Sequence, residues 1–208
     1  LTYFNVDANT LKSQFASLTA AQPLAWNPLL SDSADTHNLL MLTNDDQEHS
    51  FPGEPSLIQR IKNAGYTFSG GGLAGENIYA YADSVLYGHA GFVIDWGFGP
   101  GGLQNPAGHR DNLLNESFRE IGISILSDSS PATQVGPLLI TEHLARSNSS
   151  GPFLTGVAYT DTKGFGWIAL STSSPLSLVG QGKERNANGN QKLDTFVQMQ
   201  PPLSGRWE

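Results

Sequence analysis

The sequence predicts an α+β fold, because helical patterns dominate its first half and extended patterns follow them. Apolar residues recur at helical spacing in several early segments. The runs at 121–126 and 137–144 are instead alternating or continuously apolar, as strands are. With 208 residues, of which 38% are hydrophobic and 10% aromatic, the chain can bury the core of one good-sized domain.

Two helices are expected near the N-terminus. A weak helical pattern covers residues 10–20. Asn27 and Pro28 mark a clearer start, since Asn caps a first turn and Pro is tolerated within it. That helix is expected over 29–43, where His37 lies on the apolar side and is interpreted as a packed structural residue. The residues that this helix should bury are Leu30, Ala34, Leu40 and Met41.

Three shorter helices should follow. One is expected over 56–64, between a Glu-Pro-Ser start and a terminating Gly. Another is expected over 83–96, although Gly88 and Gly91 each weaken it by about 1 kcal/mol relative to Ala. We expect these two glycines to allow a neighbouring element to approach closely. Asn105 and the Pro after it should begin a last short helix.

The C-terminal part is expected to form a separate β-rich appendage. A Ser-, Asn- and Gly-rich stretch marks a boundary, which divides the chain into a domain over 1–146 and an extension over 147–208. Strands at 153–160 and 166–171 predict a hairpin, and its turn lacks the acidic pattern of a calcium loop. The polar stretch 181–208 is expected to be poorly ordered or to lie on the surface.

Composition excludes several classes of function. The net charge is −8, from 11 basic and 19 acidic residues, and nucleic-acid phosphates require a basic surface instead. The chain has no cysteine, so no disulfide or Cys-based zinc site can form. No apolar run is long enough to span a membrane. The chain starts at Leu1 rather than Met, which we interpret as processing rather than cytoplasmic residence.

Four short motifs occur in order between residues 48 and 110. They are Glu-His-Ser at 48–50, Gly-Glu-Asn-Ile at 75–78, Asp-Trp at 95–96 and Gly-His-Arg at 108–110. Imidazole and carboxylate side chains together commonly hold a divalent cation or move a proton. No single motif is specific, but the ordered series is.

This series resembles the CAP superfamily, which comprises cysteine-rich secretory proteins, antigen 5 and pathogenesis-related proteins. The resemblance covers residues 24–146 and is closer to the bacterial branch, with which the absence of cysteine agrees. It implies a three-layer α-β-α sandwich with a small sheet, a secreted, extracellular protein, and a central cleft lined by two His and two acidic residues.

His49, Glu76 and His109 match three of the four cleft residues that the resemblance implies. The fourth, an acidic residue three positions after the helix Trp, falls here on Gly99. Asp95 and Glu142 are candidate substitutes. Asn77 is also assigned to the cleft, where we favour a structural role for its amide over ligand contact.

The His-Glu-His set supports two chemical interpretations. His49 and His109 can act as metal ligands for Zn²⁺ or another divalent cation, with open positions for other ligands. The same groups can instead form a hydrogen-bonded cluster that ties helices to the sheet. Glu142 and His143 are adjacent in a strand, so at most one of them can face this site.

The leading functional hypothesis is a secreted CAP-domain protein whose cleft binds a small or lipid-like ligand or a protein partner, with or without a divalent cation. One alternative is a metal-assisted hydrolase in which Glu76 is the catalytic general base. Another is a structural or adhesive surface module. Because one fold supports many functions, the family alone does not choose among them.

Overall fold

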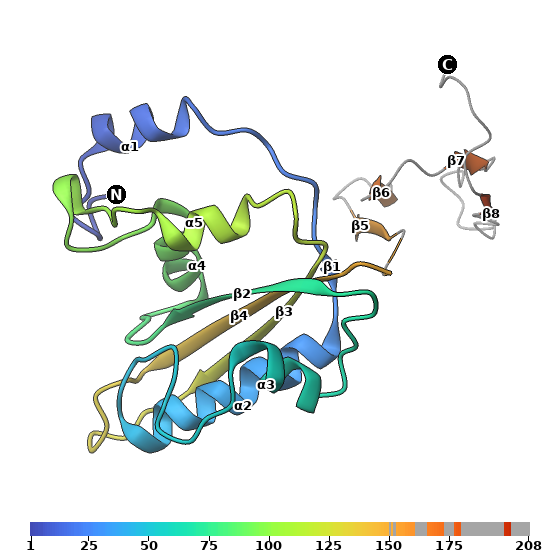
Figure 1. The fold of residues 1–208 in the computed structure, drawn as a ribbon. Coiled ribbons are helices and arrows are strands. Elements are labelled where there is room, and N and C mark those ends of the chain that lie inside the picture. Colours follow the sequence, from blue (N-terminus) through green and yellow to red (C-terminus); the bar gives the residue numbers. More distant parts are fainter. Residues whose placement is uncertain (150, 152, 161–165, 173–176, 180–197, 201–208) are drawn as a thin grey trace. The chain divides into compact units, whose positions relative to one another are not determined.

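The structure is a computed structural model that describes residues 1–149, 151, 153–160, 166–172, 177–179 and 198–200 (Figure 1). The chain divides into two compact units, Leu1–Ser150 and Gly151–Glu208. The first unit contains all four sequence motifs. None of the described helices is long and apolar enough to cross a bilayer.

A four-stranded sheet forms the middle of the first unit, in the order β1-β3-β4-β2. The long strands β2 (Gly72–Tyr79), β3 (Glu120–Ser127) and β4 (Leu138–Ser147) are antiparallel, with β4 between the other two. The two-residue strand β1 (Ala25–Trp26) pairs with β3 in parallel. The predictions for β3 and β4 are confirmed, whereas β1 was not predicted. Strand β2 lies at the edge of the sheet.

One face of the sheet is covered by α2 (Pro28–Asn44) and α3 (Leu57–Asn63) (Figure 1). The predicted start of α2 is confirmed, because the Asn27 side chain accepts a hydrogen bond from the Leu29 amide. Three of the four residues that were predicted to be buried in α2 are fully buried: Leu30, Ala34 and Met41. The fourth, Leu40, is partly buried.

The other face carries α1 (Ala8–Phe15), α4 (Val85–Ile94) and α5 (Gly108–Leu113), and a short 3₁₀ turn (Pro100–Gly102) separates the last two. Helices therefore lie on both sides of the sheet, and the predicted α-β-α sandwich is confirmed (Figure 1). The expectation for the α4 glycines is also confirmed. A Cβ on Gly88 would lie 2.2 Å from Ile140, and one on Gly91 would lie 2.7 Å from the Tyr79 ring.

The end of α4 differs from its prediction. The helix stops at Ile94, because Asp95 adopts a left-handed conformation with φ 58°. Trp96 therefore lies outside the helix, where its indole NH donates to the Phe4 carbonyl oxygen. After this turn, residues 96–98 line one pocket together with residues 78–81.

Alternation along β2 separates its side chains between the two layers. Ala74 and Ile78 pack in hydrophobic clusters with residues of α2, so Glu76, midway between them, faces the α2 and α3 layer. Asn77 and Tyr79 face the α4 and α5 layer. The second sequence motif thus supplies one polar side chain to each side of the sheet.

Among its described residues, the second unit contains two antiparallel strand pairs. Strand β5 (Leu154–Thr160) pairs with β6 (Gly166–Thr172), which confirms the predicted hairpin strands. Strand β7 (Ser177–Val179) pairs with β8 (Gln198–Gln200). The turn for which we predicted no calcium, and the rest of the polar tail, lie outside the described residues.

Candidate functional site

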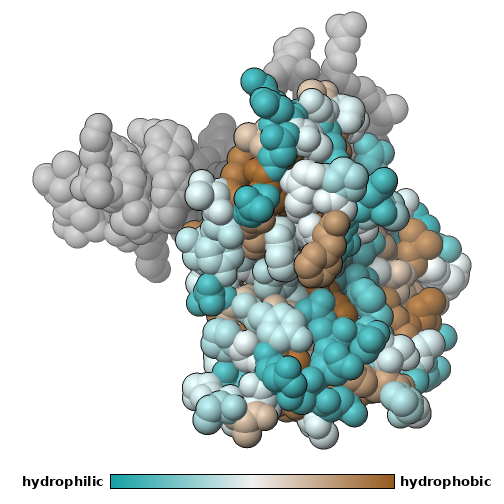
Figure 2. Space-filling model, turned by 90° about the vertical axis from the view of Figure 1, so that its left-hand side faces the viewer, coloured by the Kyte–Doolittle hydropathy of each residue, from teal (hydrophilic) through white to brown (hydrophobic). Residues whose placement is uncertain are grey.

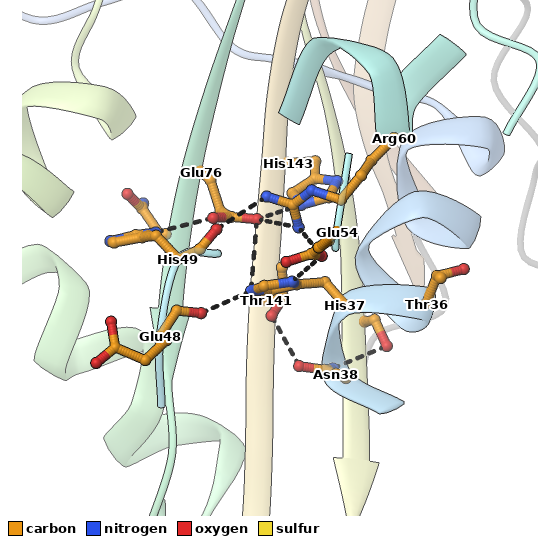
Figure 3. A network of polar contacts seen from close by, with 12 residues as sticks. Thr36, His37, Asn38, Glu48, His49, Glu54, Arg60, Glu76, Thr141 and His143 are labelled. Carbon is orange, nitrogen blue, oxygen red and sulfur yellow. Dashed lines mark hydrogen bonds and ion pairs between the residues drawn. The ribbon is translucent and has the colours of Figure 1, made fainter. Parts of the chain in front are cut away.

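Glu76 is the centre of a buried polar network on the α2 and α3 side of the sheet (Figure 3). Its Oε1 contacts His49 Nδ1 at 2.8 Å, and its Oε2 contacts His143 Nε2 at 2.8 Å. His143 lies directly opposite Glu76 in the β2–β4 register. Arg60 Nη1, from α3, lies 2.9 Å from the same Oε2. His49 and Glu76, both assigned to the cleft, are therefore in direct contact.

A second carboxylate, Glu54, completes the network. Its Oε1 lies 2.7 Å from His37 Nδ1 and 3.1 Å from Arg60 Nη1, and its Oε2 accepts from the Phe51 amide. Arg60 Nη1 thus sits between two carboxylates, although it is aligned for a hydrogen bond with neither. His37, from α2, is a packed structural residue as predicted, but it packs among charged groups rather than apolar ones.

The contacts of Glu76 stabilise its ionised form. Burial by itself raises the pKa of Glu76. Hydrogen bonds from His143 and His49 lower it, as does electrostatic interaction with His37 and Arg60. Together they outweigh burial and hold this pKa well below its ordinary value. For His143, burial dominates and lowers the pKa, despite the opposing hydrogen bond to Glu76. Glu76 is therefore an anion and His143 a neutral ring at neutral pH.

The two buried rings, His143 and His37, both have oxygen partners. His143 donates from Nε2 to Glu76, and its Nδ1 has no partner among the described residues, as expected for an unprotonated ring nitrogen. His37 contacts an oxygen at each ring nitrogen, the Glu54 carboxylate at Nδ1 and the Glu48 carbonyl oxygen at Nε2. Arg60 lies within 3.1 Å of both Glu54 and Glu76, and this shared positive charge makes the burial of two carboxylates tolerable.

His109 belongs to a separate pair on the other side of the sheet. Its Nδ1 lies 3.0 Å from Oδ1 of the fully buried Asp95, whose Oδ2 accepts from the Arg110 amide at 3.1 Å. Asp95 therefore joins the C-terminus of α4 to the first turn of α5. The structure does not bring His109 into contact with Glu76. Of the two candidate substitutes for the fourth acidic residue, Asp95 is the one beside His109.

Asn77 is fully buried, and its amide is used within the protein. Its Nδ2 donates to the His109 carbonyl oxygen and to Glu142, and its Oδ1 accepts from Asn112. Glu142 also contacts His89 at 3.4 Å. Glu142 and His143 thus face opposite layers, which confirms the alternation predicted for them.

A pocket of about 560 Å³ lies along the outer edge of β2, next to His109. Residues 78–81, at the end of β2 and just after it, form one part of its lining. Asp46 and Gln47, which precede His49 in the chain, form another. Trp96 and Phe98, which precede His109, form a third. The side chain of His49 is 62% exposed, and that of His109 is 14% exposed. The two His–carboxylate pairs therefore stand on opposite sides of the sheet edge that this pocket follows.

Both candidate ligand histidines are oriented in the way that metal ligands usually are. A metal-binding His commonly donates one ring NH to a carboxylate, which leaves the other nitrogen free to bind. His49 and His109 each contact a carboxylate through Nδ1, and Nε2 of each has no hydrogen-bond partner in the described part of the chain. However, no group of three or more His, Asp or Glu side chains among the described residues is arranged to hold an ion.

Several residues of the network were not predicted as site residues: Glu54, Arg60, His37 and His143. Their partnership depends on which strand and helix positions meet in the fold, and no local motif carries that information. The one available signal was the Glu-His pair at 142–143, for which strand alternation predicted that at most one side chain could face the site.

The profile of the cysteine-rich secretory protein family, CAP, matches residues 15–135. This match covers more than half of the chain, so the protein belongs to the CAP family, as the motif series predicted. No curated protein matches the chain significantly.

Two solved structures are similar to the chain. An extracellular SCP-domain protein from Bacillus anthracis shares 26% identity over 66% of this chain, with a TM-score of 0.46, and the chain spans 37% of that protein. An outer surface protein from Borrelia burgdorferi shares 16% identity over 68% of this chain and 86% of its own, also with a TM-score of 0.46.

Proposed function

We propose that this chain is a secreted, extracellular CAP-domain protein that binds a ligand at the outer edge of β2, and that it does not act as a hydrolase. The observation that carries the proposal is the 560 Å³ pocket at this edge, with an imidazole held by a buried carboxylate on either side of the sheet. Secretion is proposed from the family, whose name describes secretory proteins.

The environment of Glu76 favours binding over general-base catalysis. A general base must have a pKa near the working pH and an oxygen free to accept a proton. The pKa of Glu76 lies well below its ordinary value, and its two oxygens are occupied by His49, His143 and Arg60. Glu76 is therefore proposed to orient His49 rather than to activate water. A Glu76→Gln variant tests this, because a turnover found in the native protein and lost in the folded variant would restore the hydrolase hypothesis.

We propose further that a divalent cation such as Zn²⁺ binds weakly through Nε2 of His49 and of His109, either singly or together, with water as the remaining ligands. Two neutral imidazoles oriented by carboxylates provide suitable donors, and the absence of a third protein ligand among the described residues limits the affinity. Since protons compete for the same nitrogens, affinity should fall as the pH drops.

The test is calorimetric titration of Zn²⁺ into chelator-stripped protein at neutral pH. We expect binding that is reduced in His49→Ala and in His109→Ala. His89→Ala is the matched control, because the His89 side chain is similarly exposed but contacts Glu142 instead. Equal binding by all four proteins would contradict a role for the cleft histidines.

The same variants test a purely structural role for the cluster. His49 is largely exposed, whereas His37 and His143 are fully buried, so stability should depend on the buried rings. We expect the His49→Ala variant to keep a melting temperature close to that of the native protein while its Zn²⁺ binding is reduced. A large drop in melting temperature with unchanged binding would favour the structural module.

A further inference from the structure

Four aromatic side chains line the pocket beside β2: Tyr79, Tyr81, Trp96 and Phe98. Three of them follow one another as a series of neighbouring rings. The ring centroid of Trp96 lies 6.3 Å from that of Tyr79 and 6.0 Å from that of Phe98. The ring planes of these two pairs are inclined at 44° and 51°. The rings therefore form an angled aromatic surface in the pocket rather than one flat stack.

Two of the four rings remain exposed to solvent. Phe98 is fully exposed at 101%, and Tyr81 is 52% exposed. Both segments are held by hydrogen bonds, because the Trp96 indole NH donates to the Phe4 carbonyl oxygen and the Tyr81 amide donates to the Val135 carbonyl oxygen. An exposed apolar ring gains free energy when it is covered. A ligand in this pocket would cover part of both rings.

The carboxylate at the pocket gives it a negative charge. Asp46 lines the pocket and belongs to the run Asp-Asp-Gln-Glu at 45–48, which contains no basic residue. Its side chain accepts from the Gln47 amide at 2.8 Å and forms no ion pair with another described residue. The described residues that line the pocket include no Lys or Arg. A cation is therefore attracted to this pocket, and an anion is repelled.

Aromatic rings and a carboxylate together define a class of ligand. The face of an aromatic ring carries partial negative charge, so it attracts a cation that lies over it. Quaternary ammonium groups are recognised in this way. We propose that the pocket binds an organic cation through a methylated ammonium group, which packs on the rings of Trp96 and Phe98 beside Asp46. This assignment rests on the proposed binding function of the same pocket.

Other ligand classes fit these groups less well. A primary ammonium or a guanidinium brings several N–H donors, each of which needs an acceptor when it leaves water. The Gln47 side-chain oxygen already accepts from the Ala80 amide at 2.7 Å, which leaves it less capacity for such donors. A quaternary ammonium has no N–H and requires only the rings and one negative charge. A neutral acyl chain would gain from the rings but not from Asp46.

The probe for this proposal is choline, titrated by calorimetry into the chelator-stripped 208-residue chain at neutral pH and constant ionic strength. The matched control ligand is the neutral isostere of choline, in which carbon replaces the ammonium nitrogen. We expect choline to bind, and the isostere to bind about tenfold more weakly, because it has the same shape without the charge. Absence of choline binding, or equal affinity for the two ligands, would overturn the proposal.

Phe98→Leu tests whether the aromatic face is required. Leucine keeps an apolar side chain without a ring, so the affinity for choline should fall about threefold to fivefold. The matched control is Trp26→Leu, because Trp26 is also exposed, at 61%, but does not line the pocket. Its choline affinity should equal that of the native protein. Equal effects of the two substitutions would contradict packing of the cation on this ring.

Asp46→Asn tests the charge, and the affinity for choline should fall about threefold in this variant. Asp32→Asn removes the same charge from an exposed position on α2 that does not line the pocket, so it should have little effect. Equal losses in both variants would mean that the net charge, rather than Asp46, attracts the ligand, and would overturn the assignment. If choline does not bind while Zn²⁺ binding still depends on His109, the ligand class is wrong and the binding function of the pocket stands.

Discussion

The buried charges around Glu76 make the stability of the fold sensitive to acid. Two carboxylates, the Arg60 guanidinium, the His37 ring and the neutral ring of His143 share one site between the sheet and the α2 and α3 layer (Figure 3). Such a network gives little net stability over an apolar core, but removing the charge of one member leaves the others unbalanced. Protonation of Glu76 removes its negative charge, and protonation of His143 adds a positive charge that no further carboxylate balances.

Unfolding free energy is therefore expected to fall as the pH drops. The pKa of His143 is below its ordinary 6.5 in the fold, so the unfolded chain takes up the proton first, and stability is lost as the pH falls below about 6.5. The pKa of Glu76 is also lowered, so a further loss begins below about 4.5. The pKa of His89 is raised by its hydrogen bond to Glu142, so His89 contributes in the opposite direction, as stability lost at higher pH.

Urea unfolding at a series of pH values from about 7.5 to about 4 measures this dependence. His89→Ala removes the opposing contribution and should make the acid loss larger relative to the native protein. Unfolding free energy that is constant or rises between about pH 7 and pH 5 would contradict the protonation states assigned to this network.

The sequence predicted which side chains belong to the site better than it predicted the residues that they contact. His49 and Glu76 belong to recognisable motifs, and their contact is present. The partner of His109 was an open choice, because the family position falls on Gly99 and Asp95 lies four residues earlier. Arg60 and His143 could not be found, since their proximity to Glu76 follows from the strand register and from the docking of α3.

Individual elements were predictable where local chemistry marks their ends. Asn27 and Pro28 predicted the start of α2 correctly, because a cap acts within one turn. Strand β1 could not be predicted, since two residues show no periodicity and pair only because β3 lies beside them. The end of α4 was missed for a related reason: Asp95 turns the chain early so that its carboxylate can serve both His109 and the α5 amide of Arg110.

The close contact of α4 with β2 leads to a prediction for Gly91. A Cβ at this position would meet the Tyr79 ring at 2.7 Å, and a rigid aromatic ring cannot move aside easily. Overpacking costs about 1–3 kcal/mol, which exceeds the roughly 1 kcal/mol that Ala gains over Gly in a helix. We therefore expect Gly91→Ala to destabilise the protein in chemical denaturation.

Gly108→Ala is the matched control for Gly91→Ala. Gly108 begins α5, has no atom within 4 Å of its added Cβ and does not require a positive φ. The same substitution should therefore be neutral or stabilising there, by up to about 1 kcal/mol. Destabilisation of both variants to the same extent would show that contact with Tyr79 is not the cause.

The face of the first unit in Figure 2 is mostly hydrophilic, and its hydrophobic residues form separate patches rather than one continuous surface. This pattern agrees with ligand binding at a localised pocket rather than with docking over a broad apolar face. The described hydrophobic clusters of this unit all lie between Phe4 and Ala145. Its core is therefore complete before the second unit begins.

The boundary between the units leads to a prediction about truncation. Residues 147–149 are tied to the loop at 69–71: Ser147 accepts from the Ser69 amide, and Asn148 donates to the carbonyl oxygens of Gly70 and Gly71. A chain ending at residue 150 keeps these bonds, and we expect its melting temperature to stay within about 2 °C of the full chain.

A chain ending at residue 146, the boundary that the sequence predicts, loses those hydrogen bonds and frees the loop that precedes β2. At about 0.5–1.5 kcal/mol for each bond, it should be about 2–4 kcal/mol less stable than the chain ending at 150. Thermal unfolding of the three lengths measures both differences. Equal melting of the two truncated chains would place the end of the first unit at 146. A large drop for both would mean that the first unit requires the second to be stable.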